Sequence, residues 1–234
     1  MHILVIDGRH LESEFRDKFG PRHEYTHFST DYSDRTEQDR RVMEIQVAAQ
    51  GADVVFCCEN AQAFRLFSAT NLPVFAEASC DSLLETMWGE EDAAAKAMLF
   101  GFCGLPTMLN RPLLEVTLYH STNGQKLAET CAALGTDYRV VEDRVGLVTP
   151  RVICQIINEA CYTVQEGTAT MQDVDLGMKL GTNYPRGPFS WANSIGVPRV
   201  YAVLEAMWND TRDERYKICP LLKRQALRGE PFPV

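Results

Sequence analysis

Short apolar runs separated by polar segments predict a sheet of buried strands in the first 143 residues. The clearest run, residues 2–6, reads His-Ile-Leu-Val-Ile and is followed directly by a polar turn. Continuous runs of this length are typical of parallel strands that helices cover on both faces. The remaining strands are expected at residues 24–28, 53–58, 71–76, 99–103 and 138–141, with a further strand that contains Glu115 and ends at His120.

Helical patterns fill the segments between these strands, at residues 37–50, 83–88 and 122–134. Thr122 is the expected N-cap of the last of these helices, and Gly135 is expected to end it. The polar segment 29–38 is rich in Asp, Ser and Thr, which favours a solvated loop. Alternating strands and helices of this kind indicate an α/β domain.

The pattern changes after residue 143, where only helical periodicity remains. A helix is expected from Pro150, because its apolar positions recur every three or four residues at Ile153, Ile156, Ile157, Ala160 and Val164. Gly167 is its expected C-cap, and Thr170 with Asp173 forms a capping box for a second helix that Gly181 ends. We therefore predict two domains, α/β over residues 1–143 and all-α over residues 144–234.

Several motifs in a fixed order resemble the 3-hydroxyacyl-CoA dehydrogenase family. They are Gly146-Leu-Val-Thr-Pro-Arg151, Asn158-Glu159-Ala160, Glu166-Gly167, Asp173-Val-Asp175, Gly181 and Tyr184-Pro-Arg-Gly-Pro-Phe189. The resemblance is dense from about residue 73 to residue 225 and thin before residue 52. It implies a Rossmann-like N-terminal domain, shortened here, followed by the family's helical C-terminal domain, which forms a two-fold dimer.

The turn after the first strand departs from the family's Gly-x-Gly-x-x-Gly pattern. On that pattern Asp7, Arg9 and Glu12 take the three glycine positions, and only Gly8 remains, at a position that the motif leaves free. A carboxylate disfavours a diphosphate nearby, although Arg9 could instead reach a phosphate. Asp31, after the second strand, could hydrogen-bond the ribose of a dinucleotide. We favour the interpretation that this turn only supports the fold and binds no cofactor. If the protein is active, the resemblance implies NAD as its cofactor.

The family's catalytic histidine and both of its active-site asparagines also have no counterpart. Gly101 and the triplet 114–116 fix a register that places Cys103 at the histidine, Pro106 at one asparagine, and Glu115 at the carboxylate that orients the histidine. Pro150 takes the position of the second asparagine. Ser82 matches the serine that hydrogen-bonds substrate in active members, and it suits the N-cap of the helix at 83–88 equally well.

Composition narrows the class of protein further. The net charge of -9 argues against a general nucleic-acid surface. No long apolar run or signal peptide is present, so we expect a cytoplasmic protein without a membrane segment. The eight cysteines are scattered without metal-ligand spacing, so no metal is expected and buried free thiols are the favoured reading.

Three functions remain open at this point. The favoured one is a family homologue without dehydrogenase activity, a homodimer that binds an acyl-CoA or small acid ligand or serves as a partner protein. The alternative is an active NAD(P)-dependent oxidoreductase on a 3-hydroxyacyl-CoA or related 3-hydroxy acid, in fatty-acid metabolism, with a rebuilt cofactor site. The third is thiol chemistry at Cys103, which the nearby carboxylate of Glu115 would disfavour because like charges oppose the thiolate.

Overall fold

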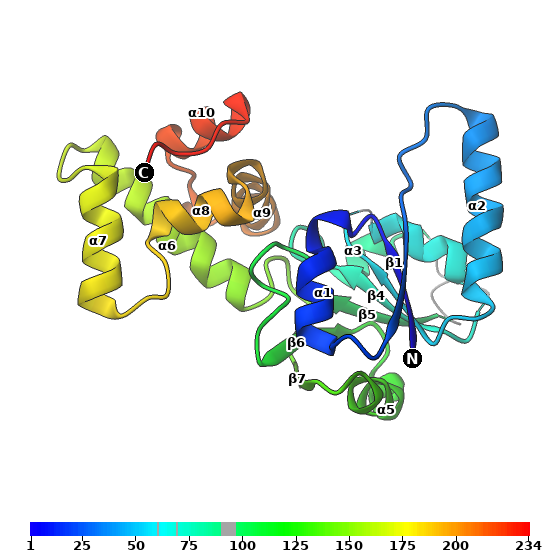
Figure 1. Cartoon of the computed structure of the whole chain (residues 1–234). Coiled ribbons are helices and arrows are strands. Elements are labelled where there is room, and N and C mark those ends of the chain that lie inside the picture. The colour runs from blue at the N-terminus through cyan, green and yellow to red at the C-terminus, as the bar shows by residue number, and fades with distance from the viewer. Residues whose placement is uncertain (60, 69, 90–96) are drawn as a thin grey trace. The chain divides into compact units, whose positions relative to one another are not determined.

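The computed structural model of the chain describes residues 1–59, 61–68, 70–89 and 97–234. These residues form two compact units (Figure 1). Unit 1 comprises residues 1–104 and 108–147, and unit 2 comprises residues 105–107 and 148–234. Each unit is described by itself below.

Unit 1 is built on one sheet of seven strands in the order β2-β1-β3-β4-β5-β6-β7. Their bounds are β1 (His2–Ile6), β2 (Glu24–Phe28), β3 (Val54–Cys57), β4 (Pro73–Glu77), β5 (Met98–Phe102), β6 (Leu113–Leu118) and β7 (Asp137–Val140). All neighbouring pairs are parallel except β5 with β6. The predicted strands and the Rossmann-like class of this domain are thus confirmed.

The strand order places β2 at one edge of the sheet. In the doubly wound dinucleotide-binding order 3-2-1-4-5-6, another strand lies outside the second one. Here a single helix, α2 (Arg35–Ala49), connects β2 to β3, and the next strand along the chain already lies on the far side of β1. The described part of the domain is therefore shortened on the β2 side.

Helices cover both faces of the sheet, which explains why the strands read as continuous apolar runs. On one face α1 (Glu12–Phe19) and α5 (Gly124–Leu134) pack on alternate strand residues such as Val5, Phe56 and Phe102. On the other face α2, the 3-10 segment η2 (Ala61–Phe67) and α3 (Leu83–Thr86) pack on the residues between them. Figure 1 shows α1 and α5 on the same side of the strands.

The helix ends agree with the sequence expectations at some positions and not at others. Gly135 ends α5 in the left-handed conformation, with φ of 73°. Thr122 does not cap α5, because a 3-10 turn, η3 (Ser121–Asn123), precedes the helix and Asn123 becomes the N-cap residue without a side-chain hydrogen bond. The α2 helix begins inside the segment expected to be a loop, where the Asp34 side chain accepts from the Glu37 amide.

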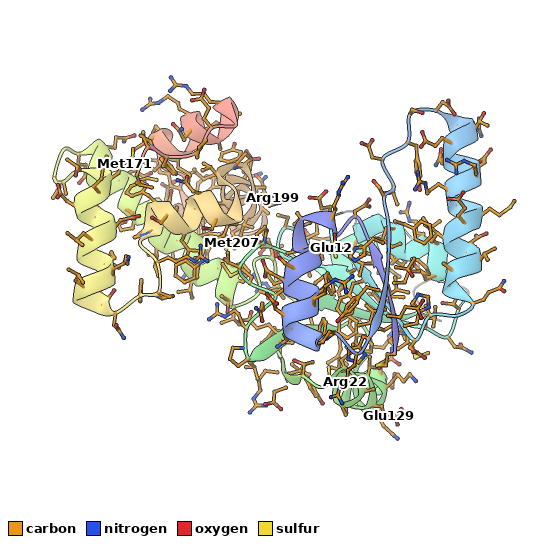
Figure 2. The ribbon with its side chains drawn as sticks, in the orientation of Figure 1. Glu12, Arg22, Glu129, Met171, Arg199 and Met207 are labelled. Atoms are coloured by element: carbon orange, nitrogen blue, oxygen red, sulfur yellow. The ribbon has the colours of Figure 1, made fainter. Side chains whose placement is uncertain are left out.

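Unit 2 is all helical, as predicted. Its helices are α6 (Thr149–Gln165), α7 (Met171–Thr182), α8 (Pro188–Ile195), α9 (Val197–Thr211) and α10 (Pro220–Arg228). Gly167 follows α6 with φ of 77°, and Thr170 with Asp173 makes a complete capping box at the start of α7. The core includes the fully buried Met207 of α9, which is labelled in Figure 2.

The turn before α8 explains two of the sequence motifs. Asp175 of α7 is buried, and its carboxylate accepts from the amides of Phe189 and Ser190 at 2.7 and 2.9 Å and from the Ser190 hydroxyl at 2.5 Å. A Cβ on Gly187 would overlap the Asp175 side chain. The aspartate and the glycine are therefore required together, because one fills the space that the other leaves.

No helix among the described residues is long and apolar enough to cross a membrane.

Candidate functional site

The sheet topology points to the crevice at the carboxyl ends of β1 and β3. The chain leaves β1 toward β2 on one side and returns to β3 on the other, so the strand order reverses at β1. In open α/β sheets, ligands bind outside the carboxyl ends of the strands at such a reversal. The residues that follow the strands here are Asp7 after β1, Cys58 and Glu59 after β3, and Ser79 after β4.

Asp7 is fixed by contacts within the chain. It adopts a φ of 53°, a left-handed conformation that aspartate tolerates better than most residues. Its carboxylate accepts from the Thr30 amide at 2.6 Å and from the Thr30 hydroxyl at 2.5 Å. Both oxygens are therefore engaged by the loop after β2. A Cβ on the neighbouring Gly8 would overlap Val5 and lie 2.8 Å from Sγ of Cys58, so this glycine permits close packing inside the protein.

His10 connects the same loop to the segment after β5 through a hydrogen bond to Gly104. The loop continues as a 3-10 turn, η1 (Arg9–Leu11), before α1 begins. Nε2 of His10 lies 3.2 Å from the carbonyl oxygen of Gly104, and Nδ1 lies 3.4 Å from Oε1 of Glu59. The loop after β1, the loop after β3 and the end of β5 are thus joined through one imidazole.

A cavity of about 740 Å³ lies beside this loop. The residues that line it come from the ends of β1 and β2, the first turns after β1, α2 and the loop after β3: Asp7, Arg9, His10, Glu12, His27, Phe28, Ser29, Arg41 and Glu59. Figure 2 labels Glu12 at the start of α1. Burial lowers the pKa of His27, and neither of its ring nitrogens has a hydrogen-bond partner among the described residues.

A second polar cluster lies at the ends of β4 and β5. Oε1 of Glu77 accepts from the amides of Ser79 at 2.9 Å and Gly104 at 3.4 Å. Burial raises the pKa of Glu77 to about 7, although both hydrogen bonds act in the opposite direction. The Ser79 hydroxyl donates to Sγ of Cys103 over 3.5 Å, and both of these residues are buried.

The pairing of β5 with β6 bears on the residues at the family's catalytic positions. Phe102 pairs with Val116 in antiparallel register. This is the last pair of the ladder: Cys103 follows the end of β5, and Glu115 lies within β6 beside Val116.

Ser82 is held by its own helix. Its hydroxyl accepts from the Glu85 amide at 3.1 Å, and the Glu85 carboxylate accepts from the amide and hydroxyl of Ser82, which completes a capping box for α3. Asp143 adds a second cap, because its carboxylate accepts from the amides of Leu83 and Leu84 at 2.9 and 3.0 Å. The capping function expected of Ser82 is therefore present, and its expected contact with substrate stays a prediction.

Most of the cysteines are buried, and burial disfavours the reactive thiolate form of those with a raised pKa. Seven of the eight are buried, and Cys80 is partly exposed. Burial raises the pKa values of Cys57, Cys58 and Cys80 well above the ordinary range, and nearby carboxylates such as Glu77 raise those of Cys58 and Cys80 further. A raised pKa keeps a thiol protonated and unreactive near neutral pH. No cluster of described residues has the composition of a metal site.

The structure brings together residues that sequence reasoning did not connect. Arg9 lines the cavity, whereas Asp31 is exposed in the loop after β2, where its amide donates to the Ser29 hydroxyl. His10, Glu59 and Glu77 were not predicted as site residues. The signal that could have found them is their position, since each follows or ends a strand of the parallel sheet.

Comparisons with known proteins agree with the resemblance in the C-terminal half. Residues 146–231 match the family model described as 3-hydroxyacyl-CoA dehydrogenase, C-terminal domain. The chain is 40% identical over 87 residues to 3-hydroxyadipyl-CoA dehydrogenase of Escherichia coli, which covers 37% of this chain and 18% of that protein. It is 32% identical over 134 residues to a probable 3-hydroxybutyryl-CoA dehydrogenase of Deinococcus radiodurans, covering 55% and 48% of the two chains.

The sequence matches thus span less than half the length of these curated relatives, while the fold matches over a longer stretch. The crystal structure of (S)-3-hydroxybutyryl-CoA dehydrogenase PaaH1 from Ralstonia eutropha superimposes with a TM-score of 0.71 at 17% identity, covering 99% of this chain and 95% of that one. At this identity the likeness concerns the fold. Residues 146–231 thus match the C-terminal domain of 3-hydroxyacyl-CoA dehydrogenases, and the chain as a whole shares the fold of (S)-3-hydroxybutyryl-CoA dehydrogenase.

Proposed function

We propose that this chain binds an acyl-CoA or another small acid ligand and does not oxidise it with a nicotinamide dinucleotide. The observation that carries the proposal is the loop between β1 and α1. In a dinucleotide-binding domain, glycines in this loop let the backbone approach the diphosphate at the helix N-terminus. Here Arg9 has a side chain at the second glycine position, and the carboxylates of Asp7 and Glu12 line the same cavity. These residues do not fit a dinucleotide bound in the family's manner.

The surroundings of Cys103 support the same proposal. The family's reaction needs a histidine that accepts the hydroxyl proton, and loss of a general base forfeits on the order of 10²–10⁴ in rate. Cys103 is buried and accepts a hydrogen bond from Ser79. Glu115 of β6 is present at the position that the resemblance assigns to the orienting carboxylate, but a carboxylate alone lacks the imidazole that it would orient.

A second candidate is an NAD(P)-dependent oxidoreductase that acts on a 3-hydroxyacyl-CoA or a related 3-hydroxy acid. The observation that favours it is the set of relatives, because proteins with 32–40% identity over the matched stretches carry the names of such dehydrogenases. This candidate requires a nucleotide that binds despite Asp7 and Arg9, and a proton acceptor other than Cys103.

Titration of the purified chain with NADH and NADPH, followed by nucleotide fluorescence, separates the two candidates. We expect no saturable nucleotide binding up to roughly millimolar concentration, and calorimetric binding of acetoacetyl-CoA without turnover when NADH is present. Saturable nucleotide binding with oxidation of NADH by acetoacetyl-CoA would establish the second candidate.

A variant that restores the glycine pattern makes this experiment sharper. The triple substitution Asp7→Gly, Arg9→Gly and Glu12→Gly removes the three side chains at the family's glycine positions. If these side chains exclude the nucleotide, the triple variant gains NADH binding that the natural chain lacks. The matched control is Arg22→Gln, which changes a charge in the turn between α1 and β2. Equal binding by the natural chain and the triple variant would refute the argument from the loop.

The expected homodimer is part of the proposal. Leu176 and Leu180 lie one helical turn apart on α7, and they are 57% and 78% exposed. Apolar side chains this exposed on one helix are suited to an interface between copies, which the resemblance also implies. Sedimentation equilibrium tests the proposal, with Leu180→Glu expected to shift the chain toward the monomer.

A further inference from the structure

A second cavity, of about 510 Å³, lies on unit 1 and has no part in the proposed function. Three segments surround it: the end of α1, the segment before β6, and the stretch from the end of α5 to the start of β7. The charged and polar residues on its wall are Lys18, Asn110, Arg111, Thr136 and Asp137. None of these residues lines the cavity beside the loop after β1, and we call the second cavity the Arg111 cavity. Figure 2 labels Arg22 beyond the end of α1 and Glu129 on α5, the two helices whose ends reach this cavity.

Arg111 holds a buried nitrogen that the described part of the chain does not satisfy. Its Nη1 atom is buried and has no hydrogen-bond partner among the described residues. The backbone around it is fixed, because the Arg111 amide donates to the Leu109 carbonyl at 2.8 Å and the Asn110 amide donates to Oε2 of Glu14 at 3.2 Å. Folded proteins place an acceptor beside a buried charged donor, because burial without one is unfavourable. The guanidinium is thus held on a cavity wall where an acceptor is required.

Lys18 adds a second cation to the same wall. Its Nζ atom donates to the carbonyl oxygens of Arg111 and Pro112, the latter at 3.2 Å. An ammonium group has three donors, so one remains for a ligand. Burial lowers the pKa of Lys18, and the carboxylate of Asp137 acts in the opposite direction. The two carbonyl groups therefore hold the ammonium group in place before a ligand binds.

The charges on the wall favour a doubly charged oxyanion with a hydroxyl group beside it. Lys18 and Arg111 carry two positive charges, and neither forms an ion pair with Asp137 within the described ranges. A guanidinium matches the oxygens of a phosphate with its parallel N–H donors, and a lysine binds phosphate as a point charge. Asp137 is exposed on the same wall, and its carboxylate can only accept hydrogen bonds. A hydroxyl group of the ligand would supply the donor that Asp137 needs.

We propose that the Arg111 cavity binds a small phosphate monoester that carries a hydroxyl group. Nη1 of Arg111 and Nζ of Lys18 donate to the phosphate oxygens, and the carboxylate of Asp137 accepts from the hydroxyl group. A carboxylate ligand fits this wall less well, because its single negative charge leaves one of the two cations without a counter-charge. No covalent step is involved, so the site is a binding site only.

Isothermal titration calorimetry of the full chain at pH 7.5 and constant ionic strength tests the proposal, with glycerol 3-phosphate, inorganic phosphate and acetate as probes. We expect glycerol 3-phosphate to bind with a Kd of about 0.1–1 mM, inorganic phosphate to bind more weakly, and acetate to show no saturation. Arg111→Gln is expected to weaken binding of both phosphates by about 10-fold or more. Asp137→Asn is expected to tighten binding of inorganic phosphate by about 1.5- to 5-fold, because it removes a negative charge, and a misfolded variant would not produce this gain.

The matched control is Arg224→Gln, which removes the same charge from the exposed surface of α10 in unit 2 and should bind as the natural chain does. A local readout is the ¹³Cε signal of Lys18, whose pKa should rise when glycerol 3-phosphate is bound. Absence of saturable phosphate binding would mean that water alone satisfies Nη1. That result, equal binding by Arg111→Gln, or an unchanged Lys18 pKa would each overturn the proposal. Nucleotide exclusion depends on Asp7, Arg9 and Glu12, none of which is changed here, so the proposed function is tested independently.

Discussion

The buried carboxyl of Glu77 makes the stability of unit 1 depend on pH in a predictable direction. Burial raises its pKa in the folded chain to about 7, against an ordinary value of 4.5. Between these two values the folded state holds a proton that the unfolded state has released. The contribution of Glu77 to the free energy of unfolding is therefore greatest below pH 4.5. It falls as the pH rises from 4.5 to 7 and stays constant above that range.

The magnitude follows from the size of the shift. One pKa unit corresponds to 1.36 kcal/mol, so a shift of this size corresponds to about 3 kcal/mol in the free energy of unfolding. The carboxyl is buried but the Glu77 residue as a whole is only half-buried, so solvent screening lowers this figure, and we expect a loss of about 2 kcal/mol between pH 4.5 and pH 7. Glu77→Gln carries no titrating proton, and its amide oxygen can still accept from the amides of Ser79 and Gly104. The variant should match the natural chain near pH 5 and exceed its stability by about 2 kcal/mol at pH 8.

Urea denaturation followed by circular dichroism at pH 5, 6, 7 and 8 measures this difference. The comparison between variant and natural chain is essential, because the lowered pKa values of His23 and His27 change stability in the opposite direction over part of this range. Glu129→Gln, an exposed carboxylate of α5 labelled in Figure 2, is the matched control and should give a difference independent of pH. The reasoning is refuted if Glu77→Gln also differs from the natural chain by a constant amount.

Other predictions concern unit 2 and the thiols. Gly187→Ala should destabilise the chain by about 1–3 kcal/mol, because the added Cβ overlaps Asp175. Gly177→Ala should stabilise the chain by about 0.5–1 kcal/mol, because Gly177 lies inside α7 with open space around it. Equal shifts in the melting temperatures of the two variants would contradict the packing argument. Thr170→Ala should cost about 1 kcal/mol by removing the cap of α7, measured by urea denaturation, and no loss would mean that the cap contributes nothing. Cys80 should react with iodoacetamide at pH 7.5 more slowly than free cysteine does, because its pKa is raised. A reaction faster than that of free cysteine, and absent in Cys80→Ser, would instead show an activated thiol.

Much of the architecture was readable from the sequence because the sheet is covered on both faces. A strand with helices on each side needs apolar residues at every position, so runs such as residues 2–6 and 54–57 stand out from the polar segments around them. Capping boxes are also local, which explains why Thr170 with Asp173 was predicted correctly. Thr122 was misassigned because the 3-10 turn that displaces the helix start leaves no distinct mark in the sequence.

The candidate site was less readable, because its contacts join distant parts of the chain. The bond between His10 and Gly104 spans 94 residues, and the bond between Thr30 and Asp7 depends on how β1 and β2 pair. The resemblance predicts that Asp7, Arg9 and Cys103 depart from the family pattern, but it does not indicate what these side chains contact. That information requires the order and register of the strands.

The position of β2 at the sheet edge has a consequence for how the domain can be re-engineered. Each parallel strand is joined to the next by its own crossover connection, so an edge strand and its connection form a separable module. The exposed segment between β2 and α2 is therefore a site where a strand and a helix can be inserted without disturbing the register of the other strands. Within the described residues β2 pairs with β1 alone, so its other edge can accept a strand from another polypeptide, such as a fused reporter peptide.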